Sequence, residues 1–372
     1  MRVMNFGAGP GTLPLRALEE AAREMCDFGG TGMSILEHSH RGSTYDAVHA
    51  ETKALFAKVL DLPDTHEVLF LHGGASLQFA ALPMAFLPAG GEAHYVVQGT
   101  WGEKALSEAV SVAKLLGGGA RVSSSVAEKD AGGAYTEVVR GGDIALPASC
   151  AYLHLTSNET IHGLQYGHDE PLPLGRPDVP LVCDMSSDFL WRPIDVRPFS
   201  FIYAGAQKNV GPSGLCVAIV KKSFIAGGRK DLPTALRYDV AMEQDSRTNT
   251  PAVFSVYLVR NVLRWLVDEG GTEEMARRNQ KKGEALYAAV MRHPDLYRCP
   301  VRPGSRSYMN AVFRLPSPEI EKAFLEGAKA KGMHGLKGHR SVGGIRVSMY
   351  NAVPLSWVEA LCDYMDSFAK TV

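Results

Sequence analysis

Two short apolar stretches that each lead to a charged side chain, within residues 181–214, restrict the fold more than any other part of the chain. Leu181-Val182-Cys183 leads directly to Asp184, and residues 201–204 lead, through a Gly-Ala-Gln turn, to Lys208. Brief apolar runs bounded by turn residues are typical of buried strands in an α/β sheet. Ligands of such sheets bind beyond the carboxyl ends of the strands. We therefore expect Asp184 and Lys208 to lie side by side at one edge of a sheet.

The surroundings of Lys208 point to a chemical role. A solvated loop is the commoner environment for a lysine. Here, glycines at 205, 211 and 214 let the backbone approach a ligand, and residues 215–220 resume as an apolar strand. Burial between apolar strands lowers the pKa of an amine and favours its nucleophilic form. Such an amine forms Schiff bases, and pyridoxal phosphate uses one, with an acidic partner such as Asp184 for its ring nitrogen.

Length and charge narrow the class of protein. A chain of 372 residues is too long for one small domain, and its pattern changes to helix, strand, helix from residue 273 onward. We expect a large cofactor-binding domain at 15–270 and a small domain at 271–372 that includes the N-terminal arm, residues 1–14. The 39 basic and 40 acidic residues nearly balance, which argues against nucleic acid as a partner.

Cysteine usage and hydropathy indicate the compartment. The six cysteines are scattered without a Cys-x-x-Cys pair, and several lie in apolar runs, which is typical of reduced core residues. The first residues have no signal-type apolar core, and no apolar run reaches the roughly 18 residues that a membrane span needs. We therefore expect a cytoplasmic protein without a membrane partner.

Two motifs have the chemistry of a phosphate and ring site. After a predicted strand at 67–72, Gly73-Gly74-Ala75-Ser76 opens a helix, whose free N–H groups and dipole attract a phosphate. The alternative is an ordinary turn with Ser76 as the helix cap. Trp101 follows a predicted strand at 94–98, so it either covers a flat cofactor ring or belongs to the core.

Arginines at two places predict anion binding. Arg346 lies in an alternating apolar strand, where an unpaired guanidinium is unfavourable, so it is best explained as a receptor for a substrate carboxylate. Arg41 beside His40 is a second anion-binding candidate, with a solvated polar loop as the alternative. His38 and His40 lack a further suitably spaced ligand, which argues against a metal site. Residues 117–142, rich in Gly and Ser, are expected to be peripheral.

Together these residues resemble the phosphoserine aminotransferase family, fold-type I, class V enzymes that depend on pyridoxal phosphate. The resemblance runs from Asn5 to Ala352 and rests on motifs in the family's order: His40-Arg41, Gly73-Gly74-Ala75-Ser76, Asn158-Glu159-Thr160, Gln207-Lys208-Asn209, Asn249-Thr250-Pro251 and His339-Arg340. It implies an α/β fold, with a mostly parallel seven-stranded sheet in the large domain and a smaller α/β C-terminal domain. It also implies a homodimer with shared active sites.

The resemblance implies a role for each cofactor-binding residue. Lys208 holds pyridoxal phosphate as a Schiff base and moves the proton between the substrate Cα and the cofactor, while Asp184 pairs with the ring nitrogen. Trp101 stacks on the ring, and Thr160 bonds near the ring hydroxyl. The phosphate is held by Ala75, Ser76, Gln207 and, from the partner subunit, Asn249 and Thr250. Some family members carry Arg where this chain has Ser76, so the phosphate is surrounded by one positive charge fewer.

The implied reaction is reversible amino transfer from L-glutamate to 3-phosphohydroxypyruvate, giving phosphoserine and 2-oxoglutarate in serine biosynthesis. Arg346 is implied to bind the substrate α-carboxylate. His339 and Arg340 are implied to bind the distal phosphate or γ-carboxylate, together with His40 and Arg41 from the other subunit. Guanidinium groups match both anions, so one site can accept either. Whether 4-phosphohydroxythreonine of pyridoxine biosynthesis is also a substrate is left open.

Three alternative functions are weighed against this one. A lyase or cysteine desulfurase would need a reactive cysteine on a mobile loop, and neither Cys299 nor Cys362 lies in a Gly- or Ser-rich loop. An aminotransferase for small neutral amino acids would not need both His-Arg pairs. A non-catalytic binding protein would be expected to lose Lys208 or Asp184, and both are present.

Overall fold

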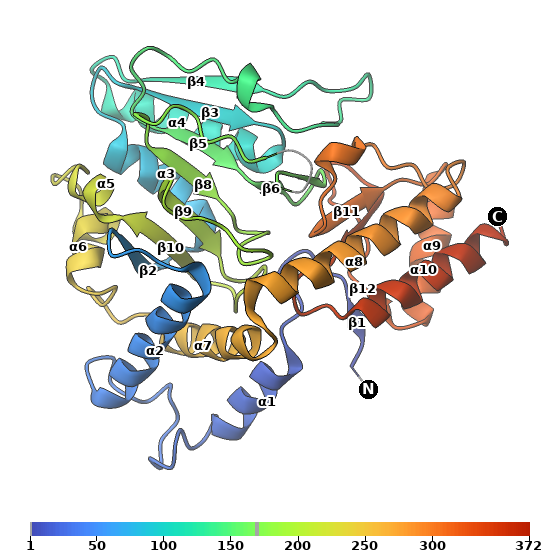
Figure 1. Cartoon of the computed structure of the whole chain (residues 1–372), viewed down its shortest axis with the longest axis horizontal. Helices are drawn as coiled ribbons and strands as arrows, with labels where there is room; N and C mark the ends of the chain where they lie inside the picture. Colours follow the sequence, from blue (N-terminus) through green and yellow to red (C-terminus); the bar gives the residue numbers. More distant parts are fainter. Residues whose placement is uncertain (1, 168–170) are drawn as a thin grey trace.

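The computed structural model describes residues 2–167 and 171–372. A wide sheet with its helices forms most of the molecule, and the C-terminal elements form a smaller group beside it (Figure 1). The N-terminus lies next to this smaller group, far from the outer strands of the sheet.

The main sheet has seven strands in the order β2-β10-β9-β8-β5-β3-β4. Strand β10 is antiparallel to β2 and β9, and the other adjacent strands are parallel, which confirms the predicted mostly parallel sheet. The bounds are β2 His66–His72, β3 Glu92–Val97, β4 Arg121–Val126, β5 Leu153–Thr156, β8 Leu181–Asp184, β9 Phe199–Gly205 and β10 Leu215–Lys221.

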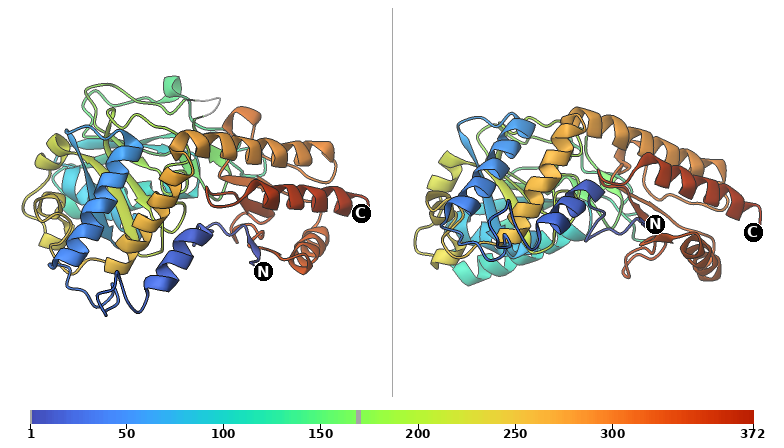
Figure 2. Two further views of the ribbon diagram at one scale, coloured as in Figure 1. Left: turned by 60° about the horizontal axis from the view of Figure 1, so that its bottom comes forward. Right: turned by 90° about the horizontal axis from the view of Figure 1, so that it is seen from below.

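Helices cover both faces of this sheet, as a mostly parallel sheet requires. In the right-hand view of Figure 2, α2 (Ser43–Leu60) and α7 (Val253–Asp268) lie on one side and α4 (Thr100–Leu116) on the other. Strands β9 and β10 are therefore buried almost throughout. The remaining elements of this part are α1 Leu15–Glu24, α3 Gly74–Phe86, α5 Lys222–Ala226, α6 Tyr238–Glu243, β6 Asn158–Glu159, β7 Leu164–Gln165 and the 3-10 turns Gly141–Asp143 and Thr234–Leu236.

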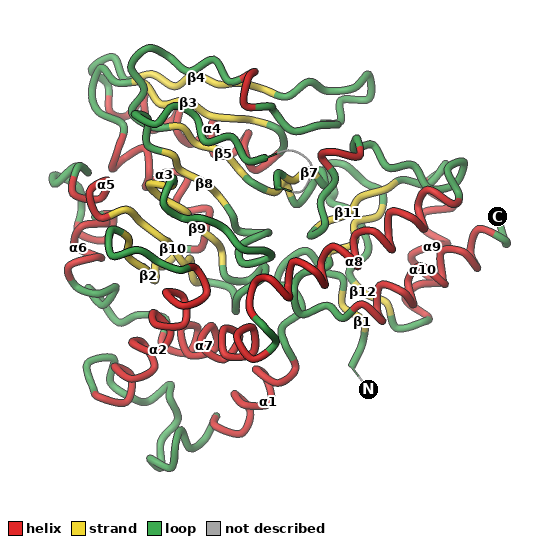
Figure 3. The backbone as a smooth tube through the Cα atoms, in the orientation of Figure 1, coloured by secondary structure: helices red, strands yellow, loops and turns green. Residues whose placement is uncertain are grey.

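Residues 117–142, expected to be peripheral, are mostly exposed or half-buried. They contain a strand that was not predicted, β4, which forms an edge of the main sheet, parallel to β3. The strand has no apolar pattern in the sequence because its serines form hydrogen bonds instead of packing in the core. The hydroxyls of Ser123 and Ser125 each lie 2.9 Å from a ring nitrogen of His94. The first helix, α1, ends at Glu24 and is followed by a glycine-rich loop, shown in Figure 3.

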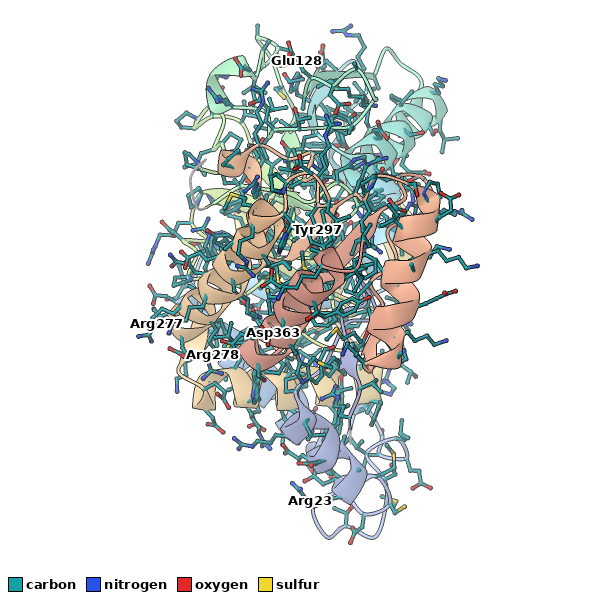
Figure 4. All side chains as sticks on the ribbon, turned by 90° about the vertical axis from the view of Figure 1, so that its right-hand side faces the viewer. Arg23, Glu128, Arg277, Arg278, Tyr297 and Asp363 are labelled. Carbon is teal, nitrogen blue, oxygen red and sulfur yellow. The ribbon has the colours of Figure 1, made fainter. Side chains whose placement is uncertain are left out.

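A second apolar core lies among the C-terminal elements. Helices α8 (Gly271–Arg292), α9 (Pro318–Ala330) and α10 (Leu355–Ala369) pack with β11 (Asn310–Phe313) and β13 (Ile345–Ser348). The 3-10 turn Pro303–Ser305 lies between α8 and β11 in the chain. Tyr297, labelled in Figure 4, is buried there and its hydroxyl donates to the carbonyl of Met365 (2.9 Å). The N-terminal strand β1 (Met4–Asn5) pairs with β12 (Met333–His334), so the arm belongs structurally to this core.

Among the described residues, no helix is both long enough and apolar enough to cross a membrane.

Candidate active site

A cavity of about 230 Å³ opens at the carboxyl ends of β5, β8 and β9, where ligands of α/β sheets bind. Its wall combines the starts of α3 and α4 with the segments that follow these three strands. The lining residues are Gly73, Gly74, Ala75, Ser76, Phe79, Trp101, Thr156, Asn158, Thr160, Asp184, Ser186, Ser187, Gln207, Lys208, Ser213 and Gly214. Seven residues predicted to bind a cofactor are among them: Ala75, Ser76, Trp101, Thr160, Asp184, Gln207 and Lys208.

Lys208 lies in the cavity wall with its Nζ 5.6 Å from the centre of the Trp101 ring. The pKa of Lys208 is lowered to about 8: burial is the largest cause, the positive charge of Arg346 also lowers it, and the charge of Asp184 acts in the opposite direction. The N-terminal arm packs against the same side chain, since a Cβ on Gly9 would lie 3.0 Å from the Lys208 Cδ. Lys208 is therefore a lysine that loses its proton easily and faces a cavity.

Asp184 ends β8 beside Lys208, as expected from the parallel pairing of β8 with β9. Burial raises the pKa of Asp184, whereas two hydrogen bonds from Ser186 and the charge of Lys208 oppose that rise. The Ser186 hydroxyl and backbone N–H both donate to Oδ1 of Asp184, at 2.6 and 2.8 Å. The Asp-x-Ser spacing is a signal for this local turn, and the sequence reasoning did not use it.

The start of α3 forms a cradle of backbone N–H groups. Gly73 and Gly74 have φ values of 83° and 62°, which side-chain-bearing residues rarely adopt. A Cβ on Gly73 would also come within 2.7 Å of the Leu77 side chain. Gln207 faces the same cavity, and its buried Oε1 has no hydrogen-bond partner within the described residues. A helix start with free N–H groups and a nearby amide can hold a phosphate.

Trp101 supplies the aromatic surface of the cavity. It is half-buried in the first turn of α4, and its Nε1 has no partner in the part of the chain that the structure describes. The Nζ of Lys104 lies 4.5 Å from the centre of the same ring.

The arginines and histidines predicted to bind substrate are outside the cavity wall. Arg346, on β13, is close enough to lower the pKa of Lys208, and its buried Nε lacks a partner among the described residues. His339 lies in the loop between β12 and β13 of the small core, where its Nδ1 is 2.7 Å from the Ser341 hydroxyl. Arg340 beside it is exposed. Burial lowers the pKa of His339, and the charges of Arg346, Lys104 and Arg340 lower it further.

Four predicted residues are not brought to Lys208 within one chain. His40 and Arg41 lie in the loop before α2, and Asn249 and Thr250 are exposed just before α7. Asn249 instead lines a second cavity, of about 400 Å³, with residues that include Tyr238. These four are the residues that the family resemblance assigns to a partner subunit.

Several cavity residues had no role in the sequence-based prediction. Asn158 is an example: its amide donates to the Ser187 hydroxyl (2.7 Å) and to Asn310 Oδ1 (2.8 Å), linking the cavity to the small core. Its position in the Asn158-Glu159-Thr160 motif was the available signal. The other cavity residues without a predicted role were Phe79, Thr156, Ser186, Ser187 and Ser213.

Known proteins share this architecture over the full chain. Residues 3–361 match the model of the family Aminotransferase class-V. A phosphoserine aminotransferase of Niallia circulans is 47% identical over 370 residues, 100% of this chain and 99% of the relative. The solved phosphoserine aminotransferase of Bacillus circulans subsp. alkalophilus has a TM-score of 0.93 and 46% identity, covering 100% of this chain and 99% of that one. The pyridoxal-phosphate-bound phosphoserine aminotransferase of Trichomonas vaginalis has a TM-score of 0.91 and 33% identity, covering 98% and 100%. The chain therefore belongs to the class-V aminotransferases and, among them, to the phosphoserine aminotransferases.

Proposed function

We infer that this protein catalyses reversible amino transfer between L-glutamate and 3-phosphohydroxypyruvate, giving phosphoserine and 2-oxoglutarate. The observation that carries the inference is Lys208, whose pKa is lowered to about 8 in a cavity that also contains Asp184 and a glycine-rich helix start. Full-length relatives at 44–47% identity that are named phosphoserine aminotransferases support the same reaction.

The residues of the cavity fit pyridoxal phosphate. Ala75, Ser76 and Gln207 would hold its phosphate, Asp184 its ring nitrogen, Thr160 the region of its ring hydroxyl and Trp101 its face. When bound, the group supplies an aldehyde that condenses with amines and a ring that withdraws electrons from the substrate Cα. The start of α3 has no side-chain cap among the described residues, so its N–H groups are donors that fit the phosphate at this end of the cavity.

The chain's own residues would then bind substrate and move protons. Lys208 acts first as a nucleophile and then as the group that takes the Cα proton and returns it, a task suited to an amine whose pKa lies near 8. Arg346 would orient the α-carboxylate, which places the Cα–H bond toward the Lys208 Nζ. His339 and Arg340 would bind the distal anion, and their charge selects phosphate or a γ-carboxylate over a neutral side chain.

A homodimer would complete the site. His40, Arg41, Asn249 and Thr250 lie away from Lys208 in one chain, so we assign them to the partner's site across a two-fold interface. We also propose a cytoplasmic location, which the six free cysteines support. The two apolar cores support a division into a large domain, 15–270, and a small domain, 271–372, that includes the arm 1–14.

An amino-donor comparison tests the reaction. Purified protein with pyridoxal phosphate is assayed with phosphoserine, serine and alanine as donors to 2-oxoglutarate, and glutamate formation is measured. We expect efficient turnover of phosphoserine, and serine and alanine should be poor donors because they lack the distal anion. Equal turnover of all three donors would instead favour an aminotransferase for small neutral amino acids.

A further inference from the structure

Glu159 is a buried carboxylate in the structure around the cofactor cavity. It has no exposed surface, and it lies between two cavity residues, Asn158 and Thr160. Burying a carboxylate is unfavourable unless donors surround it.

The donors are backbone N–H groups at the start of α4. Oε2 of Glu159 accepts from the N–H of Trp101 (3.0 Å), and Oε1 accepts from the N–H of Gly102 (2.8 Å). Helices are usually capped by a Ser, Thr, Asp or Asn next to their first turn. In α4 that position is Gly99, and the carboxylate comes from 57–58 residues away in sequence.

The helix start is shaped to receive this carboxylate. A Cβ on Gly99 would lie 2.4 Å from the carboxyl carbon of Glu159, so any side chain there would displace it. The backbone of Glu159 is itself held in a tight hairpin, since its carbonyl accepts the N–H groups of His162 (3.1 Å) and Gly163 (2.8 Å). The hairpin makes a second contact with α4, where His162 Nε2 lies 3.0 Å from the Thr100 hydroxyl.

We propose that Glu159 is a positioning residue that sets the place of the Trp101 indole against the cofactor ring by holding the N–H groups of Trp101 and Gly102. The inference rests on the proposed function, because it gives Trp101 the stacking role. Glu159 follows Asn158 and precedes Thr160, so it fixes the indole relative to the segment that supplies these two cavity residues. The pKa of Glu159 is raised to about 8: burial raises it most, the two N–H bonds lower it, and the charges of Asp184 and Glu103 also raise it. The two N–H groups are therefore the contacts that favour the carboxylate form of Glu159.

A double-mutant cycle tests the proposal in the full-length protein. Glu159→Gln, Trp101→Ala and the double variant are stripped of cofactor and titrated with pyridoxal phosphate. The dissociation constant and the induced circular dichroism of the bound cofactor are measured. Above pH 8, where Glu159 is ionised, glutamine retains one acceptor but turns an NH₂ donor toward an N–H, so Glu159→Gln should weaken binding roughly 5- to 100-fold and reduce the dichroism. In the Trp101→Ala background the same change should weaken binding less than about twofold, because the residue it acts through is gone.

The control is Glu103→Gln, which removes a carboxylate from the same helix turn. Glu103 accepts from Lys129 (3.0 Å) and the Tyr135 hydroxyl (2.8 Å), so this variant should bind cofactor as the wild type does. Equal effects of Glu159→Gln with and without Trp101, or a wild-type dissociation constant and dichroism in Glu159→Gln, would overturn the proposal. If Glu159→Gln does not fold, Glu159→Asp, which keeps the charge one methylene short of the N–H groups, is put through the same cycle with the same criteria. Failure of the wild type to bind pyridoxal phosphate or to transfer amino groups would count against the proposed function instead.

Discussion

At the scale of single residues, two buried lysines show how surroundings decide chemistry. Lys282 donates to the carbonyls of Met349 and Tyr350, both at 2.8 Å, so its amine is used within the fold. Lys208 faces a cavity and is influenced by Arg346 and Asp184. Burial lowers the pKa of both, to about 7 and about 8, but it is Lys208 that a ligand can reach.

Replacing Lys208 by alanine should abolish amino transfer. Loss of a positioned proton-transfer group alone lowers a rate by about 10²–10⁴-fold, and here the nucleophile is lost as well. Turnover is measured with phosphoserine, and attachment of the cofactor is measured by borohydride reduction and peptide mapping. Lys222→Ala, at the opposite end of β10, is the matched control and should retain both properties. Borohydride-trapped cofactor and normal turnover in Lys208→Ala would contradict the assignment.

Variants of the anion-binding residues should separate the two ends of the substrate. Arg346→Ala should impair glutamate and phosphoserine alike, because both carry an α-carboxylate. Arg340→Ala or His339→Ala should impair phosphoserine and spare alanine. Loss of a charge-assisted bond in a partly dry site weakens binding by about 2–4 kcal/mol, or roughly 30- to 1,000-fold. The measurement is kcat/KM for glutamate, phosphoserine and alanine. An equal loss for phosphoserine and alanine in Arg340→Ala would contradict the proposal that Arg340 binds the distal anion.

At the scale of elements, helix α8 buries Lys282, which should make the free energy of unfolding depend on pH. Burial lowers the pKa of Lys282 from 10.5 to about 7 in the native state, whereas the unfolded chain keeps the ordinary value. Between pH 7 and 10.5 the unfolded lysine binds a proton that the native one does not, so the free energy of unfolding rises with pH. Below pH 7 both forms are charged, and the unfavourable burial stays constant. The slope from this group is at most about 1.4 kcal/mol per pH unit.

Lys282→Met should remove this contribution. Urea unfolding of the cofactor-free protein at pH 7, 8 and 9 should therefore show a steeper rise with pH in the wild type than in the variant. The absolute stability of Lys282→Met is not the test, because methionine leaves two carbonyls without their donor. Lys281→Met, an exposed neighbour on the same helix, is the control and should keep the wild-type slope. Parallel slopes for the wild type and Lys282→Met would show that the lysine remains charged.

The elements also show where sequence reasoning succeeds. Strands β8, β9 and β10 are buried on both faces, so their apolar runs and the charged residues after them were visible in the sequence. Strand β4 was missed because its serines bond to His94 at an edge, where few apolar residues are required. Glu159 had no predicted role because its partners are N–H groups of a distant helix, and main-chain partners leave no side-chain pattern.

At the scale of the whole molecule, the order of the elements along the chain does not predict how the two apolar cores are joined. The arm returns to the small core through β1 and β12, and Tyr350 donates to the carbonyl of Ala8 (2.6 Å). Gly11 in turn donates to the carbonyl of Gln207 (2.7 Å), so the arm joins the small core to the lysine loop. Motif order predicted the cavity of one chain, whereas His40, Arg41, Asn249 and Thr250 lie away from that cavity, and their role in the site of a second subunit is a proposal.

Complementation between two inactive variants tests whether the site is shared. Lys208→Ala and Arg41→Ala homodimers each lack one component in both sites. In a mixed dimer the Arg41→Ala subunit supplies Lys208 and the Lys208→Ala subunit supplies Arg41, so one of the two sites is complete. Random pairing after joint unfolding and refolding makes half of the dimers mixed, which should restore up to about one quarter of wild-type activity per subunit. The control is the Lys208→Ala/Arg41→Ala double variant mixed with wild type. In its mixed dimers one site lacks Lys208 and the other lacks Arg41, so neither site is complete. Mixtures of the single variants that never exceed the sum of their separate activities, despite proven subunit exchange, would show that Arg41 serves its own subunit.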